Sequence, residues 1–414
     1  MKLQIKLLKM LWKFSNWIKL LFFLLIFPNN SIANISFRNI NNTQFSILTC
    51  APGNEIYSLF GHSGLRIKNN SENIDQVVNW GLFEFNDDQF QFGYDFAKGR
   101  LSYYMGIQRT ASFLNEYKSS NRKVSEQVLN LSNSNKNILI ELINTNNLPE
   151  NKKYKYEFFY DNCSSRIRDL LGEIFKNEII WNLNKDDNQF TFREIINKNL
   201  QKKPWLGLGI NLVLGSPIDV KVDNNNLMFL PKYVEEILDK TIINENGKKE
   251  KIVIQKINLV SGDETNTEIT NISFWFWLSF MFTILLLILK LDRLFKFWSS
   301  ISLFGLGLLG FILLFMWFET DHQGTKNNFN LLWATPTHWL MLIFIISKKP
   351  SVFKSVFSVI SLVIIFSTIL FWFIIPQELH QAIKPLILQT SIIYFYYYKK
   401  NKQQLNLTET SDSV

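Results

Sequence analysis

The chain has 414 residues, and 44 Lys and Arg against 35 Asp and Glu give it a formal net charge of +9. Hydrophobic residues make up 47% of it and phenylalanine alone occurs 37 times, which is high for a soluble protein. Near residue 270 the composition changes from polar sequence to a series of apolar stretches, whose short connections carry much of the basic excess. This distribution is typical of membrane orientation and argues against nucleic-acid binding.

Residues 1–33 are predicted to be a signal peptide or a signal anchor. Five lysines lie ahead of the apolar run Leu20–Phe27, and Ser31-Ile32-Ala33 fits a small-x-small cleavage site. The run is shorter than the roughly 20 residues that cross a bilayer comfortably. Whether the segment is cleaved or stays as an anchor, it predicts that the sequence after it lies outside the cytoplasm.

Residues 34–268 are predicted to form a periplasmic domain of mixed helix and sheet. The expected elements are strands at 45–49, 62–67 and 76–84, helical sequence from 111 to about 143 with an ambiguous helix-or-strand stretch near 126–131, an aromatic strand at 154–160, a helix to about 174, a Gly-rich loop at 205–217, a helix at 227–238, and a linker or weak hairpin at 244–268.

The strands at 62–67 and 76–84 are expected to form a hairpin around the polar turn at 69–73. If the hairpin has its midpoint near Glu72, His62 lies opposite Gly81. Asn79 is then the diagonal neighbour of His62 on the same face. An amide side chain at Asn79 is then within reach of the imidazole.

Cys163 is expected at the first turn of an amphipathic helix. It recurs with Ile167, Leu170, Leu171 and Ile174 at helical spacing on one face, so the helix packs against the sheet with the thiol at its inner end. Free N–H groups at a helix N-terminus stabilise a thiolate and can also cradle an oxyanion. We therefore predict that Cys163 is a nucleophile, and that Asp161 or Asn162 caps the helix.

His62 is the predicted base because it is the only histidine before the apolar stretches. A thiol nucleophile needs a group that removes its proton and later protonates a leaving alkoxide, and an imidazole suits both tasks. Asn79 is expected to orient the imidazole. Four carboxylates remain alternatives for that role: Asp75, Glu84, Glu55 and Asp161.

Four further residues are expected to bind substrate. Asn162 and Ser164 flank the thiol, and Arg166 and Arg66 carry charges that suit a lipid phosphate; solvated surface charges are the alternative for both arginines. Cys50 is expected in the core, with a Cys50–Cys163 disulfide as the alternative. Two cysteines and four scattered histidines predict no metal site, and we expect no cofactor.

Residues 269–398 are predicted to be a transmembrane domain of about five spans, followed by a cytoplasmic tail at 399–414. The expected spans are 273–289, 297–318, 329–346, 355–375 and a weaker one at 379–398. Basic residues gather after the first, third and last spans, which places the catalytic domain on the outer side. The polar residues in or near the spans are functional candidates or packing groups: Asp321, His322, Asn330 and His338.

Five ordered motifs resemble the DUF4105 family, which includes the Lnb-type lipoprotein N-acyltransferases of Bacteroidetes. They are Pro52-Gly53-Asn54-Glu55, Phe60-Gly61-His62, Asn79-Trp80-Gly81, Glu126-Gln127 and Phe159-Tyr160-Asp161-Asn162-Cys163-Ser164-Ser165-Arg166. Asn79-Trp80 stands where that family has Asn-Tyr. The order of histidine before cysteine resembles circularly permuted papain-like proteins, among them NlpC/P60 relatives and lecithin:retinol acyltransferase.

The resemblance implies an α+β, circularly permuted papain-like exoplasmic domain followed by a helical transmembrane domain. It also implies an acyltransferase of the bacterial inner membrane. Cys163 would take an acyl chain from a phospholipid as a thioester, with His62 as base, and pass it to the amino group of diacylated lipoproteins. The residues leave two other functions open, a membrane-anchored papain-like cell-wall or peptide amidase and a non-enzymatic membrane scaffold.

Overall fold

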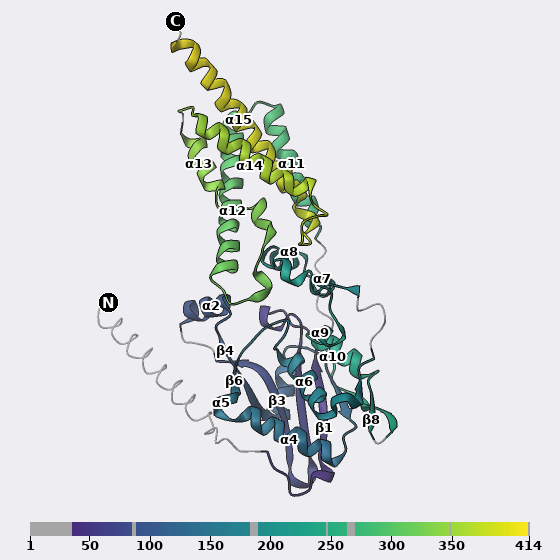
Figure 1. Cartoon of the computed structure of the whole chain (residues 1–414). Coiled ribbons are helices and arrows are strands. Elements are labelled where there is room, and N and C mark those ends of the chain that lie inside the picture. Colours follow the sequence, from purple (N-terminus) through teal and green to yellow (C-terminus); the bar gives the residue numbers. More distant parts are fainter. Residues whose placement is uncertain are drawn as a thin grey trace, which may run out of the picture.

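The computed structural model describes residues 35–84, 88–182, 189–245, 247–262, 270–347 and 349–412. The predicted signal segment lies outside this range. Figure 1 shows a sheet with flanking helices at one end and a long bundle of C-terminal helices at the other. Short helices and loops fill the level between them.

A seven-stranded antiparallel sheet forms the centre of the N-terminal part, in the order β10-β5-β1-β2-β3-β4-β6. Its strands are β1 (Gln44–Cys50), β2 (His62–Asn69), β3 (Ile74–Phe83), β4 (Ser102–Arg109), β5 (Val124–Leu129), β6 (Lys153–Lys155) and β10 (Val253–Val260). A separate small sheet contains β7 (Ile179–Ile180), β8 (Ile242–Glu245) and β9 (Lys248–Lys251).

Helices cover both faces of the central strands. The helices of this part are α2 (Gln89–Lys98), α3 (Thr110–Ser119), α4 (Asn133–Asn147), α5 (Pro149–Lys152), α6 (Cys163–Phe175), α7 (Phe192–Leu200), α8 (Pro204–Val213), α9 (Asn224–Leu227) and α10 (Pro231–Leu238). Because successive side chains of a strand point to opposite faces, β1 packs Ile47 in one core with Ile167 of α6 and Leu48 in another with Phe113 of α3.

Three expected elements differ from the structure. The aromatic strand at 154–160 is reduced to β6, because the chain turns back at the bridge between Glu157 and Asp161. The ambiguous stretch near 126–131 is β5, which is buried along its whole length. The Gly-rich segment at 205–217 begins as α8, a helix opened by Pro204 at its first position.

The sequence at 244–268 contains more than a linker. After the β8–β9 hairpin, β10 joins the edge of the main sheet by pairing with β5. The helix predicted within 227–238 with Pro231 as its first residue is confirmed, as α10.

The C-terminal bundle consists of α11 (Ile272–Ile288), α12 (Asp292–Phe318), α13 (His338–Ile346), α14 (Val352–Leu370) and α15 (Lys384–Asp412). Among the described residues, α12 and α14 are long and apolar enough to cross a membrane, and α11 is a shorter apolar helix. The third expected span is broken into the turn Phe329–Leu332 and α13. The number of five spans therefore stays a prediction.

The polar groups flagged in the apolar part are bonded within the protein. His338 bonds Tyr394 and the Trp333 carbonyl, each at 2.9 Å. Asp321 pairs with Arg100 at 3.3 Å and Lys155 at 3.4 Å. These contacts agree with packing roles and fasten the loop after α12 onto the N-terminal part.

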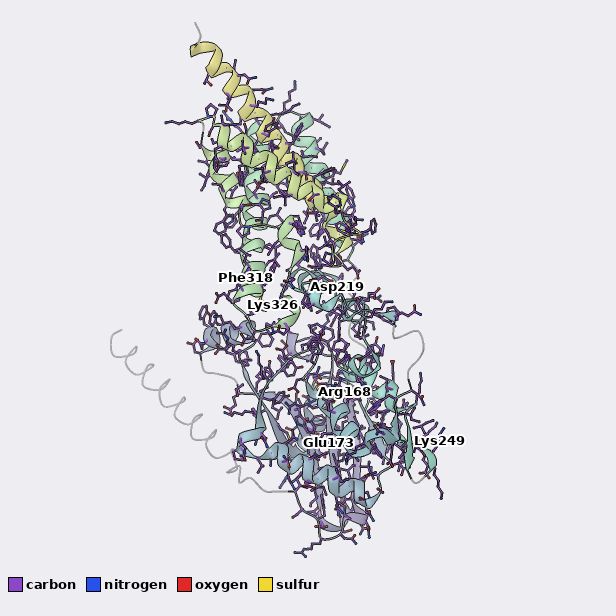
Figure 2. The ribbon with its side chains drawn as sticks, in the orientation of Figure 1. Arg168, Glu173, Asp219, Lys249, Phe318 and Lys326 are labelled. Carbon is purple, nitrogen blue, oxygen red and sulfur yellow. The ribbon has the colours of Figure 1, made fainter. Side chains whose placement is uncertain are left out.

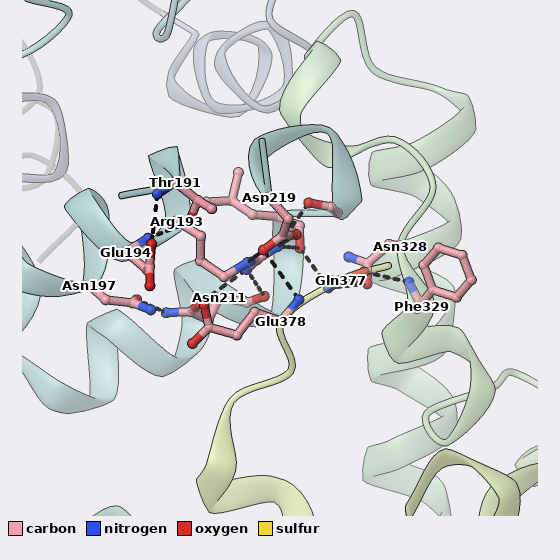
Figure 3. A network of polar contacts seen from close by, with 12 residues as sticks. Thr191, Arg193, Glu194, Asn197, Asn211, Asp219, Asn328, Phe329, Gln377 and Glu378 are labelled. Atoms are coloured by element: carbon pink, nitrogen blue, oxygen red, sulfur yellow. Dashed lines mark hydrogen bonds and ion pairs between the residues drawn. The ribbon is translucent and has the colours of Figure 1, made fainter. Parts of the chain in front are cut away.

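A buried arginine organises the level between the two parts (Figure 3). Arg193 of α7 is 1% exposed and its guanidinium holds both carboxylate oxygens of Asp219, at 2.7 and 3.0 Å. It also donates to the carbonyls of Asn211, Leu214 and Gly215 at the end of α8. One side chain thus fixes the C-terminal end of α8 and the turn that follows it.

The turn after α8 is also hydrogen-bonded to loops of the C-terminal bundle. Asp219 accepts the backbone N–H of Glu378 at 3.2 Å, and the Leu214 carbonyl accepts the Gln377 amide at 3.0 Å. Asn328 donates to the Leu212 carbonyl at 2.7 Å. Two bundle loops are therefore bonded to a segment that Arg193 holds in place.

Candidate active site

His62 begins β2, and two glycines allow it to stand there. Gly61 has a φ of 84°, and a Cβ on it would lie 2.4 Å from the Cys50 carbonyl oxygen. Only glycine permits this turn beside β1. At Gly64, a Cβ would lie 3.1 Å from the Asn79 side-chain oxygen, so its absence leaves room for that amide.

The imidazole of His62 is held by Asn79. Nε2 lies 3.1 Å from Asn79 Oδ1, and Asn79 pairs with Gly64 across the β2–β3 ladder. This pairing confirms the predicted hairpin register. Phe113 of α3 packs against the imidazole, with 6.4 Å between the ring centroids. With Nε2 bound to an amide oxygen, Nδ1 is the nitrogen left for the thiol.

The other candidates for the orienting role are engaged elsewhere or exposed. Asp75 accepts from Arg66 and Thr110, and Asp161 accepts from Arg166. Glu55 and Glu84 are exposed to solvent.

Cys163 is the first residue of α6, and Asn162 is its N-cap. Asn162 Oδ1 accepts the N–H groups of Ser164 and Ser165 at 2.8 and 3.0 Å, and Ser165 Oγ accepts the N–H of Asn162 in return. Those two helix-end donors are therefore used by the cap and do not form the oxyanion cradle expected from the sequence. The cap makes no use of the N–H of Cys163, the first residue of the helix.

Ser63 was missed by the sequence analysis and joins the two elements of the site. Its Oγ lies 2.9 Å from Ser164 Oγ, and both serines are fully buried. The Ser63 N–H also hydrogen-bonds the Cys163 sulfur. The available signal was the alternation of Ser63 with Leu65 and Ile67, which puts the three residues on the face of β2 that packs in one core with Ile167 of α6. This link sets α6 in register with β2 so that residues 62 and 163 meet.

The thiol and the imidazole favour each other's charged forms. Burial raises the pKa of the Cys163 thiol, but the charge of His62, a hydrogen bond with its imidazole and the Ser63 N–H outweigh burial and lower that pKa below its usual 9.0. Burial lowers the pKa of His62, but the thiolate and the Asn79 oxygen raise it above its usual 6.5. The arrangement therefore supports a thiolate–imidazolium pair.

Cys50 is the opposite kind of cysteine. Burial raises the pKa of its thiol well above 9.0, and it lies in the core cluster with Phe113 and Tyr117. Both cysteines are free, so the disulfide alternative is wrong. The core position predicted for Cys50 is confirmed.

Two family models match this chain. The Lnb N-terminal periplasmic domain matches residues 35–198, and the Lnb transmembrane domain matches residues 266–404. The chain belongs to the Lnb family. It is accordingly a membrane protein with a periplasmic N-terminal domain, and the matched periplasmic region contains His62, Asn79 and Cys163. No match to the chain was found among curated proteins or solved structures.

The two arginines expected to bind substrate have structural partners in the Lnb periplasmic domain. Arg66 is buried and donates to both oxygens of Asp75, at 2.8 and 2.7 Å, and to Glu126 at 3.0 Å. Arg166 holds Asp161 with two bonds and stacks on a tyrosine ring. Both guanidinium groups thus have carboxylate partners within the domain, and their binding of a lipid phosphate stays a prediction.

Asn162 and Ser164 are also occupied. The amide of Asn162 donates to the carbonyls of Phe158 and Phe229, at 2.6 and 2.8 Å, while its oxygen caps α6. The hydroxyl of Ser164 bonds Ser63. All four side chains therefore have partners within the protein, and substrate binding by them stays a prediction.

The ion pair predicts the pH dependence of alkylation at Cys163. Iodoacetamide should modify Cys163 at a lower pH than it modifies an ordinary cysteine, because His62 lowers the pKa of this thiol. In His62→Ala the thiolate loses its counter-charge but stays buried, so the midpoint should move up by one pH unit or more. Mass spectrometry of the Cys163 peptide against pH measures both. An unchanged midpoint in His62→Ala would contradict the ion pair.

Proposed function

We propose that this Lnb-family chain transfers an acyl chain from a phospholipid, through a thioester on Cys163, to the N-terminal amine of a diacylated lipoprotein. The proposal includes the bacterial inner membrane as location and a circularly permuted papain-like fold for the periplasmic domain. The observation that carries it is the contact of a helix-end thiol with an asparagine-held imidazole in a membrane-anchored Lnb domain.

In the first half-reaction the Cys163 thiolate attacks the ester carbonyl carbon of the phospholipid. A C–S bond forms, the ester C–O bond breaks, and the His62 imidazolium gives its proton to the leaving alkoxide, which departs as a lysophospholipid. The Cys163 N–H is placed to donate to the transient oxyanion. Asn79 keeps the imidazole oriented throughout.

In the second half-reaction the lipoprotein amine attacks the thioester. A C–N bond forms and the C–S bond breaks, while neutral His62 takes the proton of the amine and the thiolate is restored. Both substrates are lipid-anchored, so a domain held at the membrane meets them at a raised effective concentration. The nearly complete burial of the Cys163 side chain favours an amine acceptor over bulk water.

Trapping the thioester tests the proposal. The full-length protein in bilayers of a phospholipid with one labelled acyl chain should gain one acyl group on the Cys163 peptide, release lysophospholipid, and lose the label to hydroxylamine. Adding a diacylated lipopeptide with a free N-terminus should move the label into an amide. The Cys50 peptide is the internal control and should stay unlabelled.

Three alternatives, a lipid hydrolase, an amidase and a scaffold, give different results in the same experiment. A hydrolase would release labelled fatty acid and form no amide. A cell-wall or peptide amidase would leave the phospholipid intact and cleave a peptide substrate. A scaffold would give neither a thioester nor a product.

A further inference from the structure

The loop between β1 and β2 exposes two apolar side chains a few residues before His62. Ile56 is 65% exposed and Tyr57 is 60% exposed. The loop is nevertheless held in place, because Lys203 donates to the Gly53 carbonyl at 3.1 Å and Arg122 donates to the Ala51 carbonyl at 2.9 Å. The exposure of Ile56 and Tyr57 is therefore set by the fold of this loop.

This loop lies between two helices that rest on the bundle. On one side, α2 packs Tyr94 against Phe315 of α12, with 6.3 Å between ring centroids, and pairs Lys98 with Glu319 at 3.6 Å. Figure 2 shows Phe318, the last residue of α12, at the level of α2. The start of α2 projects Phe90, which is 83% exposed.

On the other side, α8 contacts the bundle. Its Leu208 belongs to the bundle core, and Trp205 packs against Phe276 of α11, with 6.0 Å between ring centroids. Lys203, which holds the β1–β2 loop, directly precedes this helix. Figure 1 shows α2 and α8 beside the same end of the bundle. The exposed loop therefore faces the outer ends of the membrane helices.

A row of aromatic rings leads from the exposed loop toward the thiol. Centroid distances are 6.0 Å from Tyr57 to Phe83, 5.6 Å from Phe83 to Tyr103 and 4.5 Å from Tyr103 to Tyr156. The Tyr156 ring lies beside Gly81, with its Cε2 3.3 Å from where a Cβ on that glycine would be. Gly81 is two residues along β3 from Asn79, which holds His62. Phe92 of α2 packs on Phe83, 5.8 Å away, and joins the row to the helix on the bundle.

We propose that Ile56, Tyr57 and Phe90 enter the outer leaflet and that the aromatic row seats one acyl chain of a bilayer phospholipid, bringing its ester to Cys163. A phospholipid is the expected ligand because the exposed loop and α2 lie next to the outer ends of the membrane helices. A surface in that position contacts lipid. Aromatic rings with a nearby lysine are the side chains that favour the membrane interface. The inference rests on the proposed acyl transfer and adds the route by which its donor arrives.

The test compares two acyl donors on the same thiol. The full-length protein in phosphatidylethanolamine bilayers is offered either the bilayer lipid or water-soluble 4-nitrophenyl acetate, and acylation of Cys163 is measured for each. In the Ile56→Ser/Tyr57→Ser double variant and in Phe90→Ser, the ratio of lipid to soluble rates should fall about tenfold, the effect expected when one apolar side chain no longer leaves water.

Ile254→Ser is the matched control. Ile254 is 64% exposed, almost the same as Ile56, but it lies in β10 at the end of the sheet where Val253 pairs with Leu129, opposite the end where Cys50 pairs with Val124. Its ratio should match that of the wild type. The proposed route is overturned if the ratio of the lipid rate to the soluble-ester rate is unchanged in the loop and α2 variants. This holds whether both rates stay the same or both fall together, and acyl transfer itself would stand. A wild type that reacts only with the soluble ester overturns the proposed function as well.

Discussion

A Cys163→Ala variant should lose acyl transfer by about 10⁴-fold or more, because covalent catalysis has no path without its nucleophile. The expected result in cells is lipoproteins that lack the N-linked acyl chain in a strain where this variant replaces the wild type. Mass spectrometry of lipoprotein N-terminal peptides measures it. Membrane insertion should be unaffected, since the substitution removes one sulfur atom at the end of a helix.

Cys50→Ala is the control for this prediction. Cys50 is equally buried and sits on the strand next to His62, where Cys50 and His62 are paired residues of the β1–β2 ladder. The small cavity left by its sulfur should cost stability on the order of 1 kcal/mol and leave the acyl chain in place. Full N-acylation in a Cys163→Ala strain would remove the nucleophile from the mechanism.

The local parts of the site were predictable because short-range patterns determine them. Alternation from His62 to Ile67 and a polar turn fixed the hairpin register, and this register brings Asn79 to the imidazole. Helical spacing from Cys163 to Ile174 identified the face that packs on the sheet. Five motifs then connected these local elements to one family.

The long-range parts were not predictable in the same way. Arg66 looked like a free charge in the sequence, since nothing local shows that Glu126 of β5 reaches it across the intervening strand β1. The link from Ser63 to Ser164 spans a hundred residues and involves two ordinary hydroxyls. Chain neighbours carry no information about such contacts, so the distant partners of Arg66 and Ser164 could not be predicted.

The segment at 205–217 shows tertiary packing overriding local propensity. Two glycines lower the helix propensity of α8 by about 1 kcal/mol each relative to alanine, which favoured a loop. The structure instead forms a helix whose Leu208 joins the bundle core and whose Gly207 lies against the preceding helix. The information that made this a helix lay in the membrane part of the chain.

Arg193→Met should destabilise the protein by about 3–5 kcal/mol, the cost of removing one partner from a buried ion pair. Methionine keeps the apolar stem but leaves Asp219 and the carbonyls of Leu214 and Gly215 without their donor. Asp219 also receives the backbone of Glu378, so the joint to the bundle loosens with it. For a domain of this size the apparent melting temperature should fall by about 10 °C. Fluorescence-monitored melting of the full-length protein in detergent measures the change.

Arg100→Met is the control, because it removes an arginine from a surface ion pair and not from a buried one. Arg100 also crosses between the N-terminal part and the bundle, where it pairs with Asp321 at 3.3 Å, but its side chain is half exposed. Solvent screens an exposed pair, so its loss should shift melting by only about 2–4 °C. A similar small shift for both variants would mean that the Arg193 network does not hold the joint. A large fall in melting temperature for Arg193→Met alone would be explained by burial. Both are arginine–aspartate pairs, and they differ in their access to water.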